Sequence, residues 1–223
     1  MTRLAYDEIF AYQLSLAILR DNLKKLDSNK FSVCPSSIID YFRSLLSFKL
    51  NKDQENAAIE IINDIRSEKR TLRLLHGDVG SGKTIVAILA AYYVIKSGYQ
   101  VAFLAPTELL AKQHHNFISK IFIKENISSD ILLASSVNKK EIKKKLFDNQ
   151  IKIIIGTHSL LQDDVKFNNL SFVIIDEQHR FGVEQRMKIR EKGKRVDTLL
   201  LTATPIPRTM MLTILGDISV STI

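Results

Sequence analysis

The sequence contains little cysteine, glycine or proline. Its one cysteine, Cys34, excludes an internal disulfide framework and fits a reducing compartment. The five histidines are scattered and Cys34 has no cysteine partner, so no metal cluster is predicted. Only 8 glycines and 4 prolines are present, which excludes a collagen-like or low-complexity chain and is typical of an ordinary globular protein.

Long apolar runs are also missing. The longest, such as residues 85–91, fall far short of the roughly 20 residues that span a bilayer. The first ten residues, MTRLAYDEIF, carry an acidic pair and no apolar signal core. We therefore expect a soluble, cytoplasmic protein with no membrane partner.

The length and the hydrophobic fraction of the chain allow one full domain. The chain has 223 residues, of which 45% are hydrophobic, enough for one core or for one core with an appendage. Lysine and arginine number 32 against 24 acidic residues, which gives a net charge of +8. A basic balance favours an anionic partner such as nucleic acid or a membrane surface, although basic proteins are common.

The pattern of apolar residues changes near residue 48. Residues 3–48 show helical spacing of apolar residues, interrupted at 27–35, where Pro35 can open a second helix. From Thr71 onward, short β-branched runs alternate with helical patterns. This change predicts a helical linker segment over residues 1–48 and a second domain over residues 49–223.

The alternation in the second domain predicts an α/β fold. Six runs that are apolar almost throughout are typical of strands covered on both faces: 71–77, 100–106, 131–136, 151–157, 171–177 and 198–204. Helical patterns cover 83–97, 107–124, 139–148 and 183–193. We expect a mostly parallel sheet with helices on both faces. Ligands of such sheets bind at the carboxyl ends of the strands, where five of these runs carry small, polar or charged residues.

Residues 77–84, GDVGSGKT, match the pattern G-x-x-x-x-G-K-[ST] of a phosphate-binding loop. Its glycines let backbone N–H groups close around phosphate oxygens, and the helix N-terminus that follows favours anions. Lys83 is expected to reach the β- and γ-phosphates, and the Thr84 hydroxyl to ligate Mg²⁺. The other residues expected to line the nucleotide are Gly77, Asp78, Val79, Gly80, Ser81 and Gly82.

A second apolar run, FVIIDEQH, ends in an acidic pair. Asp176 is expected to hold Mg²⁺, and Glu177 to orient and deprotonate the attacking water. Together with the phosphate loop, this pair favours ATP hydrolysis over nucleotide binding alone. Gln54 has an amide that can pair with adenine, but from the residues alone an exposed helix glutamine is the simpler interpretation.

These motifs occur in the order of motifs Q, I, Ia, Ib, II and III of superfamily 2 helicases: Gln54, GDVGSGKT, APTELLAKQH, GTHSLLQDDVKF, DEQHRFGVEQR and TATPIPRT. DEQHRFGV and TATPIPRTMMLTILGDISVS resemble the RecG family of bacterial ATP-dependent DNA helicases in particular, as does the N-terminal RLAYDEIFAYQLSLAILR. The transcription-repair coupling factor is similar but usually reads DEEH at motif II. A nucleotide-gated DNA-binding scaffold without hydrolysis is the alternative from another class.

The resemblance implies a RecA-like P-loop fold, ATP and Mg²⁺ as cofactors, and branched DNA as the partner, contacted mainly through its backbone. It implies that Gln54 reads adenine, and that Gln178 and His179 couple the ATP site to Thr202 and Thr204. The residues that the resemblance places against DNA are Pro106, Thr107, Glu108, Gly156, Thr157, His158 and Arg180.

The resemblance also implies that the chain comprises linker helices and the first of two motor lobes. The family's wedge domain and second lobe have no counterpart in the sequence, so we expect hydrolysis to need that second lobe. The basic stretch 137–147 is either a solvated helix face or a phosphate patch, and 179–195 is a candidate for DNA proximity. His114 and His115 are expected on a helix surface and not as metal ligands.

Overall fold

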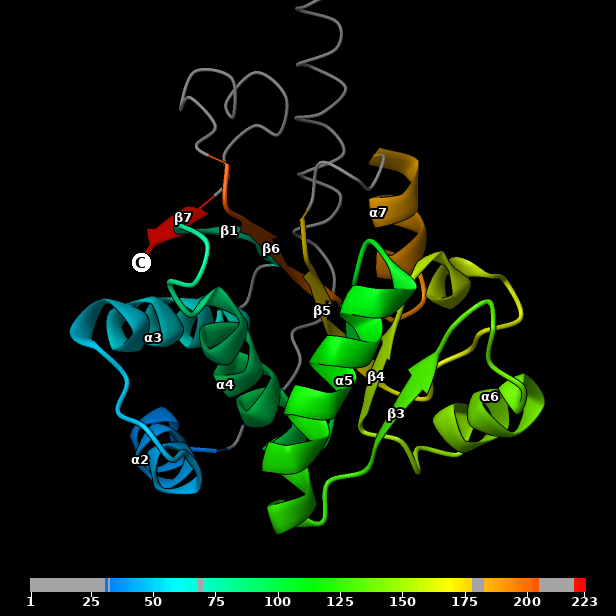
Figure 1. Cartoon of the computed structure of the whole chain (residues 1–223), viewed down its shortest axis with the longest axis horizontal. Helices are drawn as coiled ribbons and strands as arrows, with labels where there is room; N and C mark the ends of the chain where they lie inside the picture. The colour runs from blue at the N-terminus through cyan, green and yellow to red at the C-terminus, as the bar shows by residue number, and fades with distance from the viewer. Residues whose placement is uncertain (1–30, 32, 68–69, 178–182, 205–218) are drawn as a thin grey trace, which may run out of the picture.

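The computed structural model describes residues 31, 33–67, 70–177, 183–204 and 219–223. The helical pattern predicted within residues 1–30 lies outside them, as do the predicted site residues Gln178, His179 and Arg180. The described residues form one parallel sheet with helices on both faces, which confirms the predicted fold class (Figure 1).

Within the described residues the sheet has seven strands in the order β3-β4-β2-β5-β6-β1-β7, and each pair is parallel. Six of them overlap the predicted runs, although β3 begins two residues before its run and shares only residues 131–132 with it, and the seventh, β7, lies outside the predicted runs. Their bounds are β1 Leu72–His76, β2 Gln100–Leu104, β3 Ser129–Leu132, β4 Ile153–Gly156, β5 Leu170–Ile175, β6 Asp197–Thr202 and β7 Ser219–Thr222.

The predicted helices are confirmed with small changes at their ends, and α3 is an addition to them. Asn51 and Gln54 form a capping box that begins α3, and a row of buried apolar side chains holds it in place. The helices are α2 (Pro35–Leu45), α3 (Lys52–Arg66), α4 (Lys83–Lys96), α5 (Glu108–Phe122), α6 (Lys139–Phe147) and α7 (Val183–Arg190), with short 3₁₀ turns η1 (Ile123–Glu125) and η2 (His158–Leu161).

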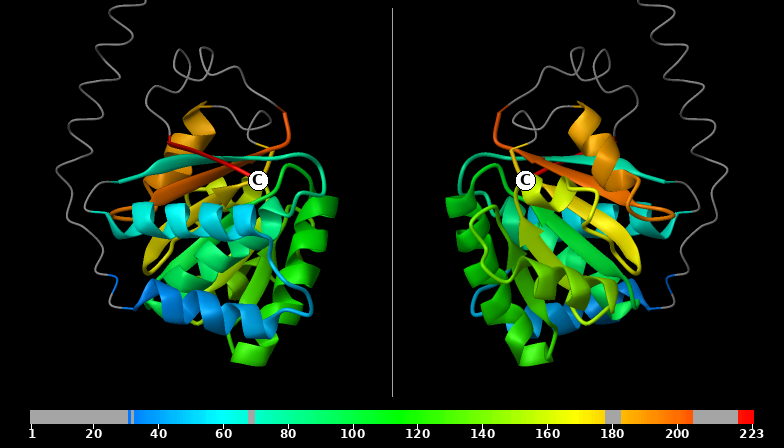
Figure 2. Two further views of the ribbon diagram at one scale, coloured as in Figure 1. Left: turned by 90° about the vertical axis from the view of Figure 1, so that its left-hand side faces the viewer. Right: turned by 90° about the vertical axis from the view of Figure 1, so that its right-hand side faces the viewer.

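Alternate strand residues divide the apolar interior into two cores, one on each face of the sheet. Leu75, Phe103 and Ile174 face the core that α2, α3, α4 and α5 cover, whereas their neighbours Leu74 and Ile175 face the core beside α6 and η2. The side views show helices on both sides of the sheet (Figure 2). Because both faces are covered, the strands read as nearly continuous apolar runs.

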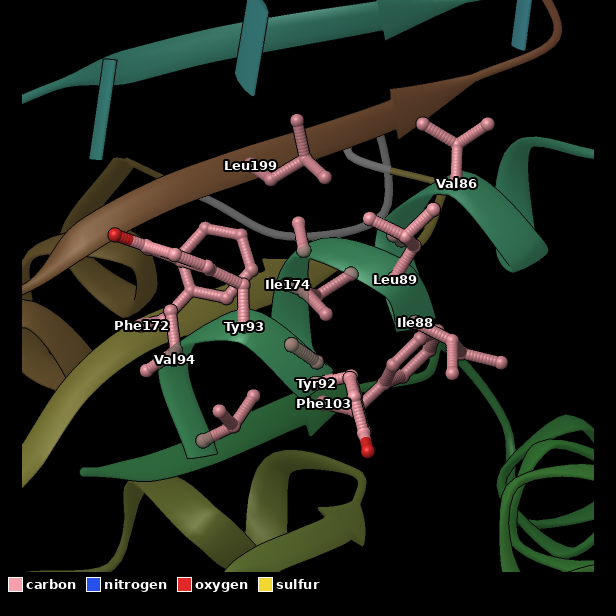
Figure 3. Close-up of a cluster of buried hydrophobic side chains, with 14 of the residues drawn as sticks. Val86, Ile88, Leu89, Tyr92, Tyr93, Val94, Phe103, Phe172, Ile174 and Leu199 are labelled. Atoms are coloured by element: carbon pink, nitrogen blue, oxygen red, sulfur yellow. The ribbon is translucent and has the colours of Figure 1, made fainter. Parts of the chain in front are cut away.

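Helix α4 is the central helix of the larger core. Every residue from 85 to 95 is buried, as expected of a helix that is apolar all round. Its side chains gather with Phe172, Ile174 and Leu199 of the strands (Figure 3). The loop 77–82 therefore leads into a helix that is anchored from residue 85 to residue 95.

Helix α2 packs on α4, although it lies on the linker side of the boundary predicted near residue 48. The Phe42 and Tyr92 rings lie 5.2 Å apart. Glu125 accepts hydrogen bonds from Tyr41 Oη (2.8 Å) and Tyr92 Oη (2.9 Å), and from Lys96 Nζ (2.8 Å). Helix α2 thus shares the core of the sheet domain, and the domain boundary stays a prediction.

Candidate nucleotide site and sheet edge

The carboxyl ends of the parallel strands bring the predicted motifs to one edge of the sheet. The loop 77–82 follows β1, residues 105–107 follow β2, and Thr157 follows β4. Asp176 and Glu177 follow β5, and Thr204 lies just beyond β6. This is the edge at which parallel α/β sheets bind ligands.

Glycines shape the loop 77–82 between β1 and α4. Gly80 and Gly82 have φ of 83° and 91°, in the left-handed region that other residues rarely adopt. A Cβ at Gly82 would lie 2.4 Å from Gln54 Nε2, and a Cβ at Gly77 would lie 2.6 Å from Ser81 Oγ. The loop conformation therefore requires glycine for both backbone freedom and close packing.

The lysine of the motif folds back over the loop. Lys83 Nζ donates to the carbonyl oxygens of Gly77 and Asp78, at 2.7 Å each. The buried Ser81 hydroxyl has no hydrogen-bond partner among the described residues. The tip of the loop is open, because the Val79 side chain is exposed. A cation and a helix N-terminus at an open loop fit a polyphosphate.

Gln54 is tied to this loop by its side chain. Its Nε2 donates to Ser81 O at 2.8 Å, while its Oε1 accepts from Asn51 N at 3.0 Å within the capping box. The interpretation of Gln54 as a freely exposed helix glutamine is therefore wrong. Its predicted contact with adenine stays a prediction.

The acidic pair begins where β5 ends. The Asp176 N–H donates to Leu104 O at 2.9 Å, which continues the pairing of β5 with β2. Asp176 Oδ2 lies 2.8 Å from His114 Nε2. Glu177 has φ of 51°, so the chain turns sharply directly after the strand.

His114 lies beside Asp176, a position that the sequence pattern did not reveal. It was predicted on the surface of a helix, but only 12% of its side chain is exposed. Its ring lies against Phe103 of β2, with centroids 4.6 Å apart, and reaches Asp176. The helical spacing could have indicated that His114 is buried, because Ala111 and Ile118 on the same face of α5 are buried.

The predicted coupling residues Thr202 and Thr204 lie beside the phosphate loop. The Gly77 N–H donates to Thr202 O at 3.3 Å. Thr202 Oγ1 lies 3.0 Å from Thr204 Oγ1 and accepts from Thr204 N at 3.2 Å. A direct backbone contact therefore joins motif III to the loop, while the part assigned to Gln178 and His179 stays a prediction.

The ends of β2 and β4 lie side by side, since the Ala105 N–H donates to Gly156 O at 2.8 Å. Among the residues predicted to contact DNA, Pro106 is partly exposed, Thr107 and His158 are exposed, and Thr157 is only 7% exposed. Gly156 is buried, and a Cβ there would lie 2.5 Å from Leu132 O. Packing therefore suffices to explain this glycine.

Glu108 is engaged with a neighbouring loop. Its carboxylate accepts from Ser135 Oγ (2.6 Å) and Ser135 N (3.2 Å). These bonds hold the pKa of the Glu108 carboxyl below its ordinary value. An ionised carboxylate repels phosphate, so this arrangement favours a role for Glu108 in holding the 133–136 turn.

Two further observations bear on ligands. In the part of the chain that the structure describes, no group of three or more His, Cys, Asp and Glu residues could hold a metal by itself. Mg²⁺ commonly uses one or two protein ligands together with phosphates, and a hydroxyl and a carboxylate such as those of Thr84 and Asp176 are oxygen donors of the kind it takes; their joint use as ligands stays a prediction. A cavity of about 380 Å³ lies elsewhere, between Phe147, Phe167 and Lys188, and includes none of the predicted site residues.

None of the helices among the described residues is long and apolar enough to cross a bilayer.

Comparisons with known proteins identify the family of the chain. Residues 51–212 match the DEAD/DEAH box helicase family, and the chain belongs to this family. More particularly, it is similar to the ATP-dependent DNA helicase RecG of Thermotoga maritima, with 46% identity over 99% of the chain and 28% of that protein. RecG of Bacillus subtilis is 44% identical over 99% of the chain and 33% of that protein.

A solved structure of RecG bound to a three-way DNA junction matches with a TM-score of 0.84 and 43% identity, covering 99% of this chain and 30% of that one. These matches confirm the resemblance to RecG drawn from the motifs. The chain spans about a third or less of the length of these relatives, 28% to 33%.

Proposed function

We propose that this chain is the first motor lobe of an ATP-dependent DNA helicase that remodels branched DNA, such as stalled forks and Holliday junctions. The observation that carries the proposal is the meeting of the phosphate loop, the acidic pair and Thr202 at one sheet edge, with Gly77 bonded to Thr202. The similarity to RecG, solved on a three-way junction, supports DNA as the partner.

The loop 77–84 binds the nucleotide phosphates in this proposal. Lys83 exchanges the carbonyl oxygens of Gly77 and Asp78, which it contacts at 2.7 Å, for phosphate oxygens. Thr84 and Asp176 hold Mg²⁺, and Gln54 contacts the adenine. When bound, Mg²⁺ supplies positive charge that offsets the charge developing on the phosphates.

Glu177 orients the attacking water and accepts its proton. Thr202 and Thr204 couple changes at the nucleotide site to the residues that contact DNA. In such motors an arginine delivered from outside the lobe stabilises the charge of the transition state. We therefore propose that hydrolysis depends on a second lobe of the longer helicase.

DNA lies along the ends of β2 and β4 in this proposal. Thr107 and His158 are exposed there and present a hydroxyl and an imidazole. Small residues and hydroxyls suit contact with phosphates and sugars without reading bases. The net charge of +8 attracts the DNA backbone to the chain.

ATP turnover tests the proposal. We expect the purified 223-residue chain to hydrolyse ATP far more slowly than the roughly 10 s⁻¹ typical of enzymes, because in this proposal a second lobe supplies the transition-state arginine. Three-way junction DNA should not raise this rate, and Glu177→Gln should remove what remains. Brisk turnover by the monomer, stimulated by DNA and lost in Glu177→Gln, would contradict the dependence on a second lobe.

A further inference from the structure

His114 joins a helix to the acidic pair across the sheet edge. It lies on α5, seven residues after Thr107, which caps that helix by accepting from Leu110 N at 3.3 Å. Its Nε2 reaches Asp176 Oδ2 at 2.8 Å, between residues 62 positions apart in the chain. The histidine therefore holds the Asp176 side chain from a different element of the fold.

The surroundings fix the ring of His114. The Phe103 ring, fully buried in β2, lies 4.6 Å from it at an angle of 41°. Both side chains of the bonded pair are largely shielded, at 12% exposure for His114 and 15% for Asp176. A hydrogen bond in such a setting is stronger than one in water, and it restricts the rotation of the carboxylate.

The direction of the bond follows from the role proposed for Asp176. A carboxylate that holds Mg²⁺ is ionised and only accepts hydrogen bonds, so in that role Nε2 of His114 donates to Oδ2 of Asp176. Among the described residues the second oxygen, Oδ1, has no hydrogen bond, and it can accept from water or face a cation. Carboxylates that hold metals in proteins are themselves commonly hydrogen-bonded, and loss of such a partner weakens metal affinity or activity by about 10- to 100-fold.

We propose that His114 is a positioning residue that orients the Asp176 carboxylate for Mg²⁺. This inference rests on the proposed function, because it assigns Asp176 to the cation of a Mg-nucleotide. In this proposal His114 contacts neither the nucleotide nor the cation and acts only through Asp176. Its effect is confined to the part of nucleotide binding that depends on Mg²⁺.

The test is the affinity of the whole chain for ADP, measured by calorimetry in excess Mg²⁺ and again in excess EDTA. His114→Ala removes the donor, while His114→Gln places an amide N–H near the position of Nε2. His115→Ala removes the neighbouring histidine from the same helix and serves as the matched control. Thermal unfolding of each variant measures the change in stability separately.

We expect His114→Ala to lose about tenfold or more of the gain in affinity that Mg²⁺ gives, with its affinity in EDTA unchanged. His114→Gln should recover most of the gain, and His115→Ala should match the wild type. The inference is overturned if His114→Ala keeps the full Mg²⁺ gain, or loses affinity equally in Mg²⁺ and EDTA. If the wild type does not bind ADP in either buffer, the proposed function itself fails and the inference falls with it.

Discussion

Gly82 meets two demands at the start of α4. Its φ of 91° lies in the left-handed region, and its Cα hydrogens face the Gln54 amide at a distance that leaves no room for a Cβ. Gly98 shares the first demand, with φ of 94°, but a Cβ there would meet no atom within 4 Å. Comparing an alanine substitution at Gly82 with one at Gly98 therefore separates the cost of backbone strain from the cost of displacing Gln54.

We expect Gly82→Ala and Gly98→Ala to lower the free energy of unfolding by about 1–2 kcal/mol each, because both force alanine into the left-handed region. Only Gly82→Ala should also weaken ADP binding, since it pushes Gln54 away from Ser81. Denaturant unfolding and calorimetry measure the two effects. Equal losses of ADP affinity in both variants would contradict this role of Gln54.

At this scale, motif spacing predicted the loop and acidic residues but not their partners. Lys83, Asp176 and Glu177 follow from local patterns that chemistry constrains. The contacts of His114 with Asp176 and of Gln54 with Ser81 join residues 62 and 27 positions apart. Such contacts depend on how helices pack on the sheet, which no local pattern encodes.

Among the elements, β7 and α3 lie outside the predicted set for different reasons. β7 is an edge strand with one buried residue, Ser221, so it lacks the apolar run of a central strand. α3 does have the helical spacing of an apolar face, at residues 57, 58, 61, 62 and 65, so the sequence contains the signal for this helix, and the capping box of Asn51 and Gln54 marks its start. Burial of apolar residues, and not propensity alone, decides which weak patterns form elements.

A buried ionic cluster holds the amino end of β6. Asp197 and Arg195 are 0% and 1% exposed, with Oδ2 and Nε 3.9 Å apart. Asp197 Oδ1 accepts from Thr71 N at 2.7 Å, and Arg195 donates to Ser67 O. Burial raises the pKa of the Asp197 carboxyl to about 6, against the opposing effects of the Thr71 hydrogen bonds and of Arg195.

This raised pKa predicts the sign of a pH effect. The ordinary value in an unfolded chain is about 4, so the folded state binds this proton more tightly. The stabilisation is present below about pH 4 and is lost as the pH rises through about 6. Relative to Asp197→Asn, the wild type should lose up to about 2 kcal/mol of unfolding free energy between pH 4 and pH 7.

Denaturant unfolding of both proteins at each pH measures this difference, and Asp163→Asn at an exposed aspartate is the control. The difference between wild type and Asp197→Asn should fall as the pH rises, while Asp163→Asn should track the wild type. A constant difference, or one that grows with pH, would contradict the raised pKa.

At the scale of the whole molecule, the site depends on the order of the strands. β6 lies between β1, which leads to the phosphate loop, and β5, which leads to the acidic pair. Alternating strands and helices predicted a parallel sheet, but many strand orders satisfy that pattern. The observed order places Thr202 between the two halves of the candidate site.

The central claim is that the loop 77–84 binds nucleotide phosphates through Lys83. Calorimetric titration of the 223-residue chain with ADP and Mg²⁺, beside Lys83→Ala, tests it most directly. Because the ammonium already bridges Gly77 O and Asp78 O, the variant changes the loop at the point where phosphate would bind. We expect the wild type to bind and Lys83→Ala to lose detectable binding while keeping its fold. Unchanged affinity in Lys83→Ala would mean that the nucleotide binds elsewhere or not through this loop.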